Sequence, residues 1–134
     1  WFLNWRLMNY EQFNINVLSD DPMFCTSLAT ECNKFGFMLT FFEEKDIGED
    51  SLNEKKQISV NIIDIDILGT NPFDIAKKLR ISSNSPIFGV FQQFNKGMQA
   101  KAKKAGYDLV FTKAMMLKSI KRVIIHISNE KKEV

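Results

Sequence analysis

The segment ISVNII, from Ile58 to Ile63, is apolar at nearly every position and is followed by an acidic residue, Asp64. This pattern predicts a strand that is covered on both faces, because a strand with one face in water would alternate apolar and polar residues. Strands of that kind are typical of parallel sheets with helices packed on each side. The segments before and after this strand therefore decide whether the chain forms such a sheet.

Predicted strands and helices alternate along the whole chain. We predict the other strands at Ile15 to Leu18, Phe37 to Phe42, Ile87 to Phe91 and Tyr107 to Thr112. We predict helices at Pro22 to Phe35, Phe73 to Arg80, Gly97 to Ala105 and Ala114 to Ile127, with only a short, weak helix within Glu43 to Gln57. Strands joined by right-handed helical crossovers form a parallel sheet, which makes this an α/β fold. The expected architecture is a doubly wound, five-stranded parallel sheet of order 2-1-3-4-5 with helices on both faces.

Length and composition indicate one soluble globular domain. The 134 residues are 45% hydrophobic and 25% charged, and the net charge is only +2. A charge so close to neutral gives no reason to expect direct nucleic-acid contact, and no apolar run approaches the ~20 residues that cross a membrane. Because the chain begins at Trp1 rather than Met, we expect it to be part of a longer protein. We expect an apolar extension or linker at residues 1–13, the domain at 14–128 and a charged tail at 129–134.

The two cysteines suggest a reducing compartment. Cys25 and Cys32 are seven positions apart on one predicted helix, which separates them by roughly 10 Å along its axis. This exceeds the ~7 Å between Cα atoms that a disulfide can bridge, so we expect both thiols to be free and to pack in the core. The single histidine, His126, has no neighbouring ligand pair that would complete a zinc site.

Charged residues follow three of the predicted strands. Asp20 lies just beyond the first strand, Asp64 ends the third and Lys113 ends the fifth. In a sheet of order 2-1-3-4-5, ligands bind at the carboxyl ends of strands one and three, where the chain connections diverge. Two carboxylates and one ammonium from distant parts of the sequence are therefore predicted to converge at this edge.

Four short motifs, in order and at matching spacing, resemble those of the receiver domains of two-component response regulators, which include the chemotaxis regulator. They are Asp20 with Pro22 and Gly36, the loop from Ile62 to Phe73 with Asp64 in the phosphoacceptor place, Ala105 to Asp108, and Thr112 with Lys113. The resemblance covers Asn16 to about Ile127. It implies a flavodoxin-like fold and a signalling domain that is not a turnover enzyme.

The resemblance also implies a phosphoryl-transfer site. Asp64 would be the phosphoacceptor, taking a phosphoryl group from a histidine kinase or a phosphotransfer protein. Mg²⁺ would be bound by Asp20, Asp64 and the backbone carbonyl of Asp66, and Lys113 would pair with the acyl phosphate. The signal would pass by protein contact to a downstream protein or output domain in the cytoplasm, with no membrane contact.

Three positions depart from the family's pattern. Ser19 stands where the family has the first acid of a pair, so we expect weaker metal binding. Phe91 replaces the hydroxyl residue that binds the phosphate, and Val110 replaces the aromatic residue that turns during signalling. The side-chain amides of Gln92 and Gln93 are candidates for a substitute donor. We therefore expect the usual switch to be weakened even where the chemistry survives.

These departures leave open a pseudo-receiver, which keeps the fold but acts as a protein-interaction module without phosphorylation. The string from Ile62 to Asp66 also resembles the first motif of haloacid-dehalogenase-type phosphatases, yet the aspartates that follow, Asp74 and Asp108, do not form the second acidic pair of those enzymes. A flavodoxin-type electron carrier is disfavoured because Asp20 and Asp21 would repel a flavin phosphate after the first strand.

The segment from Trp1 to Met8 is unusually apolar for a chain terminus. As a helix it would place Trp1, Trp5 and Met8 on one face. Three roles stay open for it: packing on the domain, joining a preceding domain, or forming a homodimer.

Overall fold

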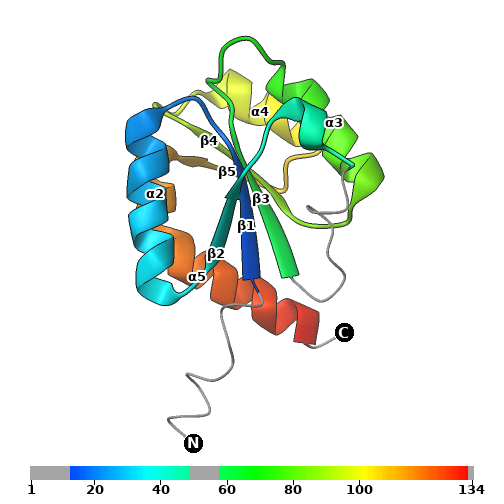
Figure 1. The fold of residues 1–134 in the computed structure, drawn as a ribbon. Helices are drawn as coiled ribbons and strands as arrows, with labels where there is room; N and C mark the ends of the chain where they lie inside the picture. Colours follow the sequence, from blue (N-terminus) through cyan, green and yellow to red (C-terminus); the bar gives the residue numbers. More distant parts are fainter. Residues whose placement is uncertain (1–12, 49–57, 133–134) are drawn as a thin grey trace, which may run out of the picture.

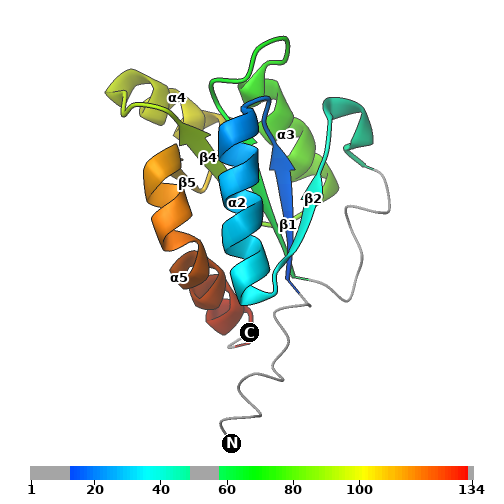
Figure 2. The same ribbon diagram turned by 60° about the vertical axis from the view of Figure 1, so that its left-hand side comes forward.

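The computed structural model describes residues 13–48 and 58–132, with the side chains of Ile58 and of residues 127–132 excepted. Within them lies a five-stranded parallel sheet of order β2-β1-β3-β4-β5, which confirms the predicted fold class. The strands are β1 (Phe13–Leu18), β2 (Met38–Phe41), β3 (Ile58–Asp64), β4 (Ile87–Phe91) and β5 (Leu109–Thr112). Helices α2 (Pro22–Phe35) and α5 (Lys113–Lys132) cover one face, and α3 (Pro72–Ser82) and α4 (Lys96–Ala105) cover the other (Figures 1 and 2).

Local sequence signals set the ends of α2. Pro22 occupies the first turn, and the carboxylate of Asp21 caps the helix by accepting hydrogen bonds from the backbone N–H groups of Met23 and Phe24 at 3.1 and 3.2 Å. At the other end Gly36 adopts a left-handed conformation with φ of 76°, which a residue without Cβ takes up readily. The predicted boundaries of this helix are confirmed.

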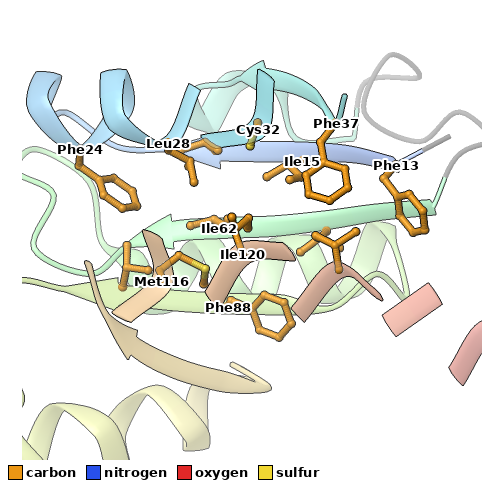
Figure 3. Close-up of a cluster of buried hydrophobic side chains, with 14 residues drawn as sticks. Phe13, Ile15, Phe24, Leu28, Cys32, Phe37, Ile62, Phe88, Met116 and Ile120 are labelled. Carbon is orange, nitrogen blue, oxygen red and sulfur yellow. The ribbon is translucent and has the colours of Figure 1, made fainter. Parts of the chain in front are cut away.

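The sheet separates two hydrophobic cores because successive side chains of a strand point to opposite faces. Alternate residues of β1 and β3, such as Ile15 and Ile62, pack against α2 and α5 (Figure 3). The larger core is formed by Phe13, Ile15, Val17, Phe24, Leu28, Cys32, Phe37, Val60, Ile62, Phe88, Val90, Met116, Ile120 and Ile124. Ile63 and Phe91 point the other way, into a core with Ile75, Ala76 and Leu79 of α3 and Ala102 of α4.

The second face of β1 and β3 also carries a row of buried asparagines. Asn14 donates a side-chain hydrogen bond to Asn16 at 3.1 Å, and Asn16 donates one to Asn61 at 3.3 Å. The hydroxyl of Thr40 donates to Asn14 at 3.1 Å, and the amide of Asn61 donates to the carbonyl of Pro86 at 3.5 Å. These amides are buried because each finds a partner across the sheet, which the sequence analysis did not anticipate.

The largest difference from the prediction is at α5. The helix continues to Lys132, into the segment expected as a charged tail, and its first residue is Lys113 rather than Ala114. Glu130 and Lys131 have high helix propensity, so charge alone did not mark an end there. At the amino-terminal boundary in the sequence, β1 begins at Phe13, which is buried and so belongs to the core rather than to the extension.

Between β2 and β3, the expected short helix is a single 3-10 turn, Glu44–Asp46. Residues 49–57 and the segment from Trp1 to Met8 lie outside the described residues. Among the residues that are described, no helix is long and apolar enough to span a membrane.

Candidate functional site

The candidate site lies where the carboxyl ends of β1 and β3 meet. The chain leaves β1 towards α2 on one face and leaves β3 towards α3 on the other, so the two connections diverge at this point. Asp64 is the last residue of β3, and only 1% of its surface is exposed. β3 is a run of mainly apolar residues that ends on an acid. This places a carboxylate at the point where the two connections diverge, which we call the switch point of the sheet.

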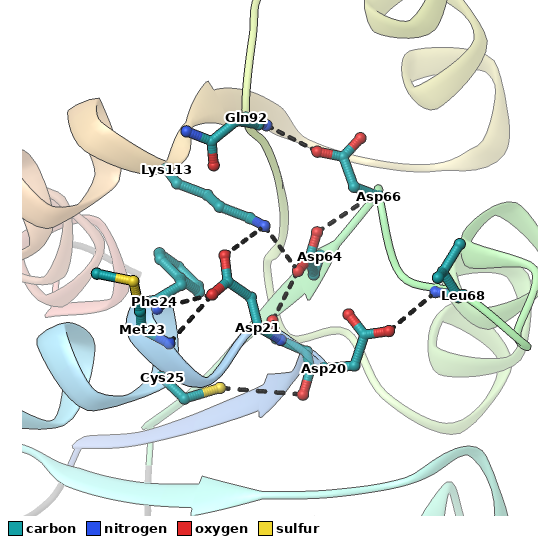
Figure 4. A network of polar contacts seen from close by, with 11 residues as sticks. Asp20, Asp21, Met23, Phe24, Cys25, Asp64, Asp66, Leu68, Gln92 and Lys113 are labelled. Carbon is teal, nitrogen blue, oxygen red and sulfur yellow. Dashed lines mark hydrogen bonds and ion pairs between the residues drawn. The ribbon is translucent and has the colours of Figure 1, made fainter.

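Three groups of the chain itself contact the Asp64 carboxylate (Figure 4). The hydroxyl of Ser19 donates to Oδ2 at 2.6 Å, and the Nζ of Lys113 lies 3.0 Å from the same oxygen. The backbone N–H of Asp66 donates to Oδ1 at 3.0 Å. The buried charge is therefore paired with an ammonium and hydrogen-bonded at both oxygens, as a buried carboxylate requires.

Lys113 bridges two carboxylates. Its Nζ is 3.0 Å from Oδ2 of Asp64 and 3.0 Å from Oδ2 of Asp21, and 8% of the residue is exposed. Burial by itself would lower the pKa of the Lys113 ammonium, but the hydrogen bonds to Asp64 and Asp21 outweigh burial and raise that pKa above its ordinary value. The same hydrogen bond from Lys113, followed by that from the N–H of Phe24, lowers the pKa of Asp21.

Asp21 is a site residue that the sequence analysis missed. One of its oxygens caps α2 and the other binds Lys113, so a single side chain links the start of α2 to the start of α5. The signal in the sequence was an acid directly before Pro22, which predicts a helix cap but does not identify a partner 92 residues away. The capping bonds hold the carboxylate in the orientation that meets the ammonium.

Asp20 and Asp66, predicted to bind a metal through a carboxylate and a backbone carbonyl respectively, lie at the same rim, and the carboxylates of both bind loop amides. Oδ2 of Asp20 accepts a hydrogen bond from the N–H of Leu68 at 3.1 Å. Oδ2 of Asp66 accepts one from the N–H of Gln92 at 2.8 Å. Both aspartates are exposed. Asp66 therefore ties the loop after β3 to the loop after β4 (Figure 4).

The donor chemistry at this rim suits a magnesium ion that keeps several of its waters. Mg²⁺ takes oxygen ligands, and the carboxylates of Asp20 and Asp64 lie near each other at this rim beside Asp66 (Figure 4). Among the side chains that the structure describes, no three acidic, histidine or cysteine residues are grouped closely enough to hold a metal by themselves. Ser19, in the place of an acid, gives its hydroxyl to Asp64 instead. A metal here would depend on two carboxylates, a carbonyl and water.

The switch positions are occupied by core residues. Phe91 is 3% exposed at the end of β4, and its ring meets that of Phe94 edge-on with centroids 6.2 Å apart. Val110 of β5 is half-buried against the core on the α3 and α4 side. Gln92 contacts the site through its backbone N–H, which donates to Asp66, rather than through its side-chain amide. Neither Phe91 nor Val110 offers a hydrogen-bond donor in its side chain.

Both cysteines are free thiols, as predicted. Cys25 lies beside the site, with its Sγ 3.9 Å from the carbonyl oxygen of Ser19. Burial raises the pKa of the Cys25 thiol and raises that of Cys32 to about 12. Both thiols are therefore protonated at neutral pH and are poor nucleophiles.

No protein-family model matches the chain, and no curated protein matches its sequence significantly. Solved structures do match the fold. The receiver domain of the TMAO respiratory system response regulator TorR is 16% identical, with a TM-score of 0.70, over 91% of this chain and 98% of that chain. The signal receiver domain of a DNA-binding response regulator from Colwellia psychrerythraea 34H is 20% identical, with a TM-score of 0.66, over 84% of this chain and 98% of that chain.

The BeF3-activated N-terminal receiver domain of RstA from Klebsiella pneumoniae is 19% identical, with a TM-score of 0.65, over 81% of this chain and 95% of that chain. The chain thus has the flavodoxin-like fold of response-regulator receiver domains. The resemblance seen in the sequence motifs and the likeness of the fold agree.

Proposed function

We propose that this chain is a response-regulator receiver domain in which Asp64 accepts a phosphoryl group from a phosphohistidine. The observation that carries the proposal is the position of Asp64 at the switch point of the sheet with the Nζ of Lys113 at 3.0 Å. The donor would be a histidine kinase or a phosphotransfer protein, and the phosphorylated form would act on a downstream protein or output domain in the cytoplasm. The likeness of the fold to receiver domains, two of them in BeF3-activated form, supports this function.

In the proposed transfer, a carboxylate oxygen of Asp64 forms a bond to phosphorus while the phosphorus–nitrogen bond of the donor histidine breaks. The electron pair of that bond stays on the imidazole, so no oxidant or reductant is needed. Bound Mg²⁺, held by Asp20, Asp64 and the Asp66 carbonyl, would neutralise charge on the phosphoryl oxygens. The ammonium of Lys113 would pair with the negatively charged oxygens of the transferred phosphoryl group.

Asp21 has a positioning role in this proposal. When Asp64 becomes an acyl phosphate, the ammonium of Lys113 must shift from a carboxylate oxygen to a phosphoryl oxygen. Asp21 holds the same ammonium at 3.0 Å and is itself held by the N–H groups at the start of α2. It can therefore keep Lys113 at the rim throughout the transfer.

A pseudo-receiver is the second candidate, and two observations favour it. Asp64 is 1% exposed, with both of its oxygens hydrogen-bonded within the chain. The residues at the family's two switch positions, Phe91 and Val110, lie against the core. Such a module would signal through protein contacts that do not depend on phosphate. The phosphatase alternative loses support because Asp108 binds Arg80 at the amino end of β5, whereas Asp64 lies at the carboxyl end of β3.

Intact-mass spectrometry after incubation with acetyl phosphate and Mg²⁺ separates the two candidates. We expect one added phosphoryl group, which is absent in Asp64→Asn and still present in Asp74→Asn. Asp74 is a matched control because it is an exposed aspartate on α3, outside the site. Failure of this donor and of phosphoramidate to label the chain would favour the pseudo-receiver, and labelling at another residue would refute the proposed acceptor.

A further inference from the structure

A cavity lies at the amino ends of the strands, opposite the carboxyl ends where Asp64 is found. It encloses about 400 Å³ between the amino ends of β4 and β5 and the middle of α5. A volume of this size is at the lower end of the range for small-molecule sites. Nothing in the proposed phosphoryl transfer uses this cavity.

The floor of the cavity is apolar. Phe88 of β4 forms part of it and is only 3% exposed, and Val123 of α5 is half-buried beside it. Leu109 of β5 also lines the cavity with 49% of its surface exposed, which is high for a large aliphatic side chain. These three side chains come from three different elements, so the apolar surface is built by the tertiary fold.

One side of the rim consists of an ion pair, so its charges are balanced. The guanidinium of Arg80 donates to Oδ2 of Asp108 at 2.8 Å and to the carbonyl of Gly106 at 2.7 Å. The same carboxylate oxygen accepts the N–H of Ile87 at 2.8 Å. Arg80 and Asp108 therefore offset each other's charge on this side of the rim.

The opposite side of the rim carries a positive charge that has no ion-pair partner among the side chains that the structure describes. Arg122 lines the cavity from α5, is exposed, and forms no ion pair with any residue that the structure describes. Arg80 and Asp108 pair with each other, so Arg122 supplies the remaining guanidinium charge at the cavity, where His126 of α5 also lies. A guanidinium suits a carboxylate or sulfonate because it can donate two parallel hydrogen bonds.

We propose that this cavity is a binding site for a small amphipathic anion, with an aromatic or aliphatic body on Phe88, Leu109 and Val123 and its acidic group on Arg122. An apolar body without charge would leave Arg122 unused, and a purely ionic ligand would leave the apolar floor in water. The combination of both features selects the class of ligand. The site is independent of the phosphorylation of Asp64.

The test is a titration of the full chain with 1-naphthoate, followed by calorimetry and by amide NMR shifts. We expect saturable binding, with shifts at the start of β4 and β5 and around Arg122. The Arg122→Gln variant should bind about tenfold more weakly, because a charged hydrogen bond is lost from the complex. Lys118→Gln is the control, since Lys118 is an exposed cation on the same helix and does not line the cavity.

A neutral probe of the same shape, 1-naphthalenemethanol, shows whether charge matters. It should bind more weakly than 1-naphthoate and should be insensitive to Arg122→Gln. The proposal is overturned if 1-naphthoate does not saturate at millimolar concentration, or if its shifts map to the rim around Asp64. It is also overturned if Arg122→Gln and Lys118→Gln weaken binding equally. None of these results depends on whether Asp64 is phosphorylated.

Discussion

Replacing Lys113 by Met tests the charge network at the centre of the site. Methionine keeps a long, unbranched side chain of similar reach but removes the ammonium that lies 3.0 Å from both Asp64 and Asp21. The carboxylate of Asp64, 1% exposed, would then retain only the hydrogen bonds from Ser19 and from the N–H of Asp66. We expect a marked loss of stability because the variant holds a buried charge without a counterion.

The size of the loss follows from burial. Removing one partner of a buried ion pair costs about 3–5 kcal/mol, and the low end applies here because 10% of the Lys113 side chain still reaches solvent. We therefore expect Lys113→Met to lower the free energy of unfolding by about 3 kcal/mol. In an Asp64→Asn background the same substitution should cost only about 1 kcal/mol, because no buried charge is left unpaired.

Urea unfolding of the four proteins of this double-mutant cycle measures the difference. Lys118→Met is the matched control, since Lys118 is an exposed residue of the same helix, and it should change stability by less than about 0.5 kcal/mol. A cost of under about 1 kcal/mol for Lys113→Met would refute the reasoning, as would an equal cost in both backgrounds. A small cost would mean that solvent, rather than Lys113, compensates the Asp64 carboxylate, and an equal cost in both backgrounds would mean that Lys113 stabilises the domain through Asp21 rather than through Asp64.

Three further results are expected. Gly89→Ala should destabilise the domain by about 1–3 kcal/mol in urea unfolding, because the added Cβ would lie 2.5 Å from Cδ1 of Ile65. An unchanged midpoint of urea unfolding would mean that the Ile65 side chain moves away at no cost. The pKa of Asp21 lies below its ordinary value of 3.8 and that of Lys113 above 10.5, so their contribution to stability is present between these values. It should be lost as the pH falls below about 4 or rises above about 10.5, and the melting temperatures of the protein and of Asp21→Asn should converge at acid pH; a constant difference down to acid pH would contradict this assignment. With Mg²⁺ and beryllofluoride, amide NMR should show changes at the loops around Asp64 but little in β5 and α5, because the family's switch side chains are missing; broad changes through α5 would show that another group transmits the signal.

The sequence by itself determined the fold and most element boundaries. Apolar runs with β-branched residues predict strands, and Pro22 and Gly36 mark the ends of α2, because these preferences act within a few residues of the chain. The place of Asp64 at the end of β3 followed from the same local pattern, together with a topology rule that holds across α/β folds. The four sequence motifs indicate the receiver class by themselves.

The tertiary structure alone decided which side chains meet. The sequence predicts Asp21 only as a helix cap. The packing of α2 beside α5 is what brings its carboxylate to Lys113. The buried amides of Asn16 and Asn61 are 45 positions apart and find each other through strand pairing. The cavity at Arg122 likewise joins two strands and a helix. Local preferences depend on neighbours in sequence, whereas ion pairs, buried amide contacts and cavities depend on the relative placement of whole elements, which no short pattern encodes.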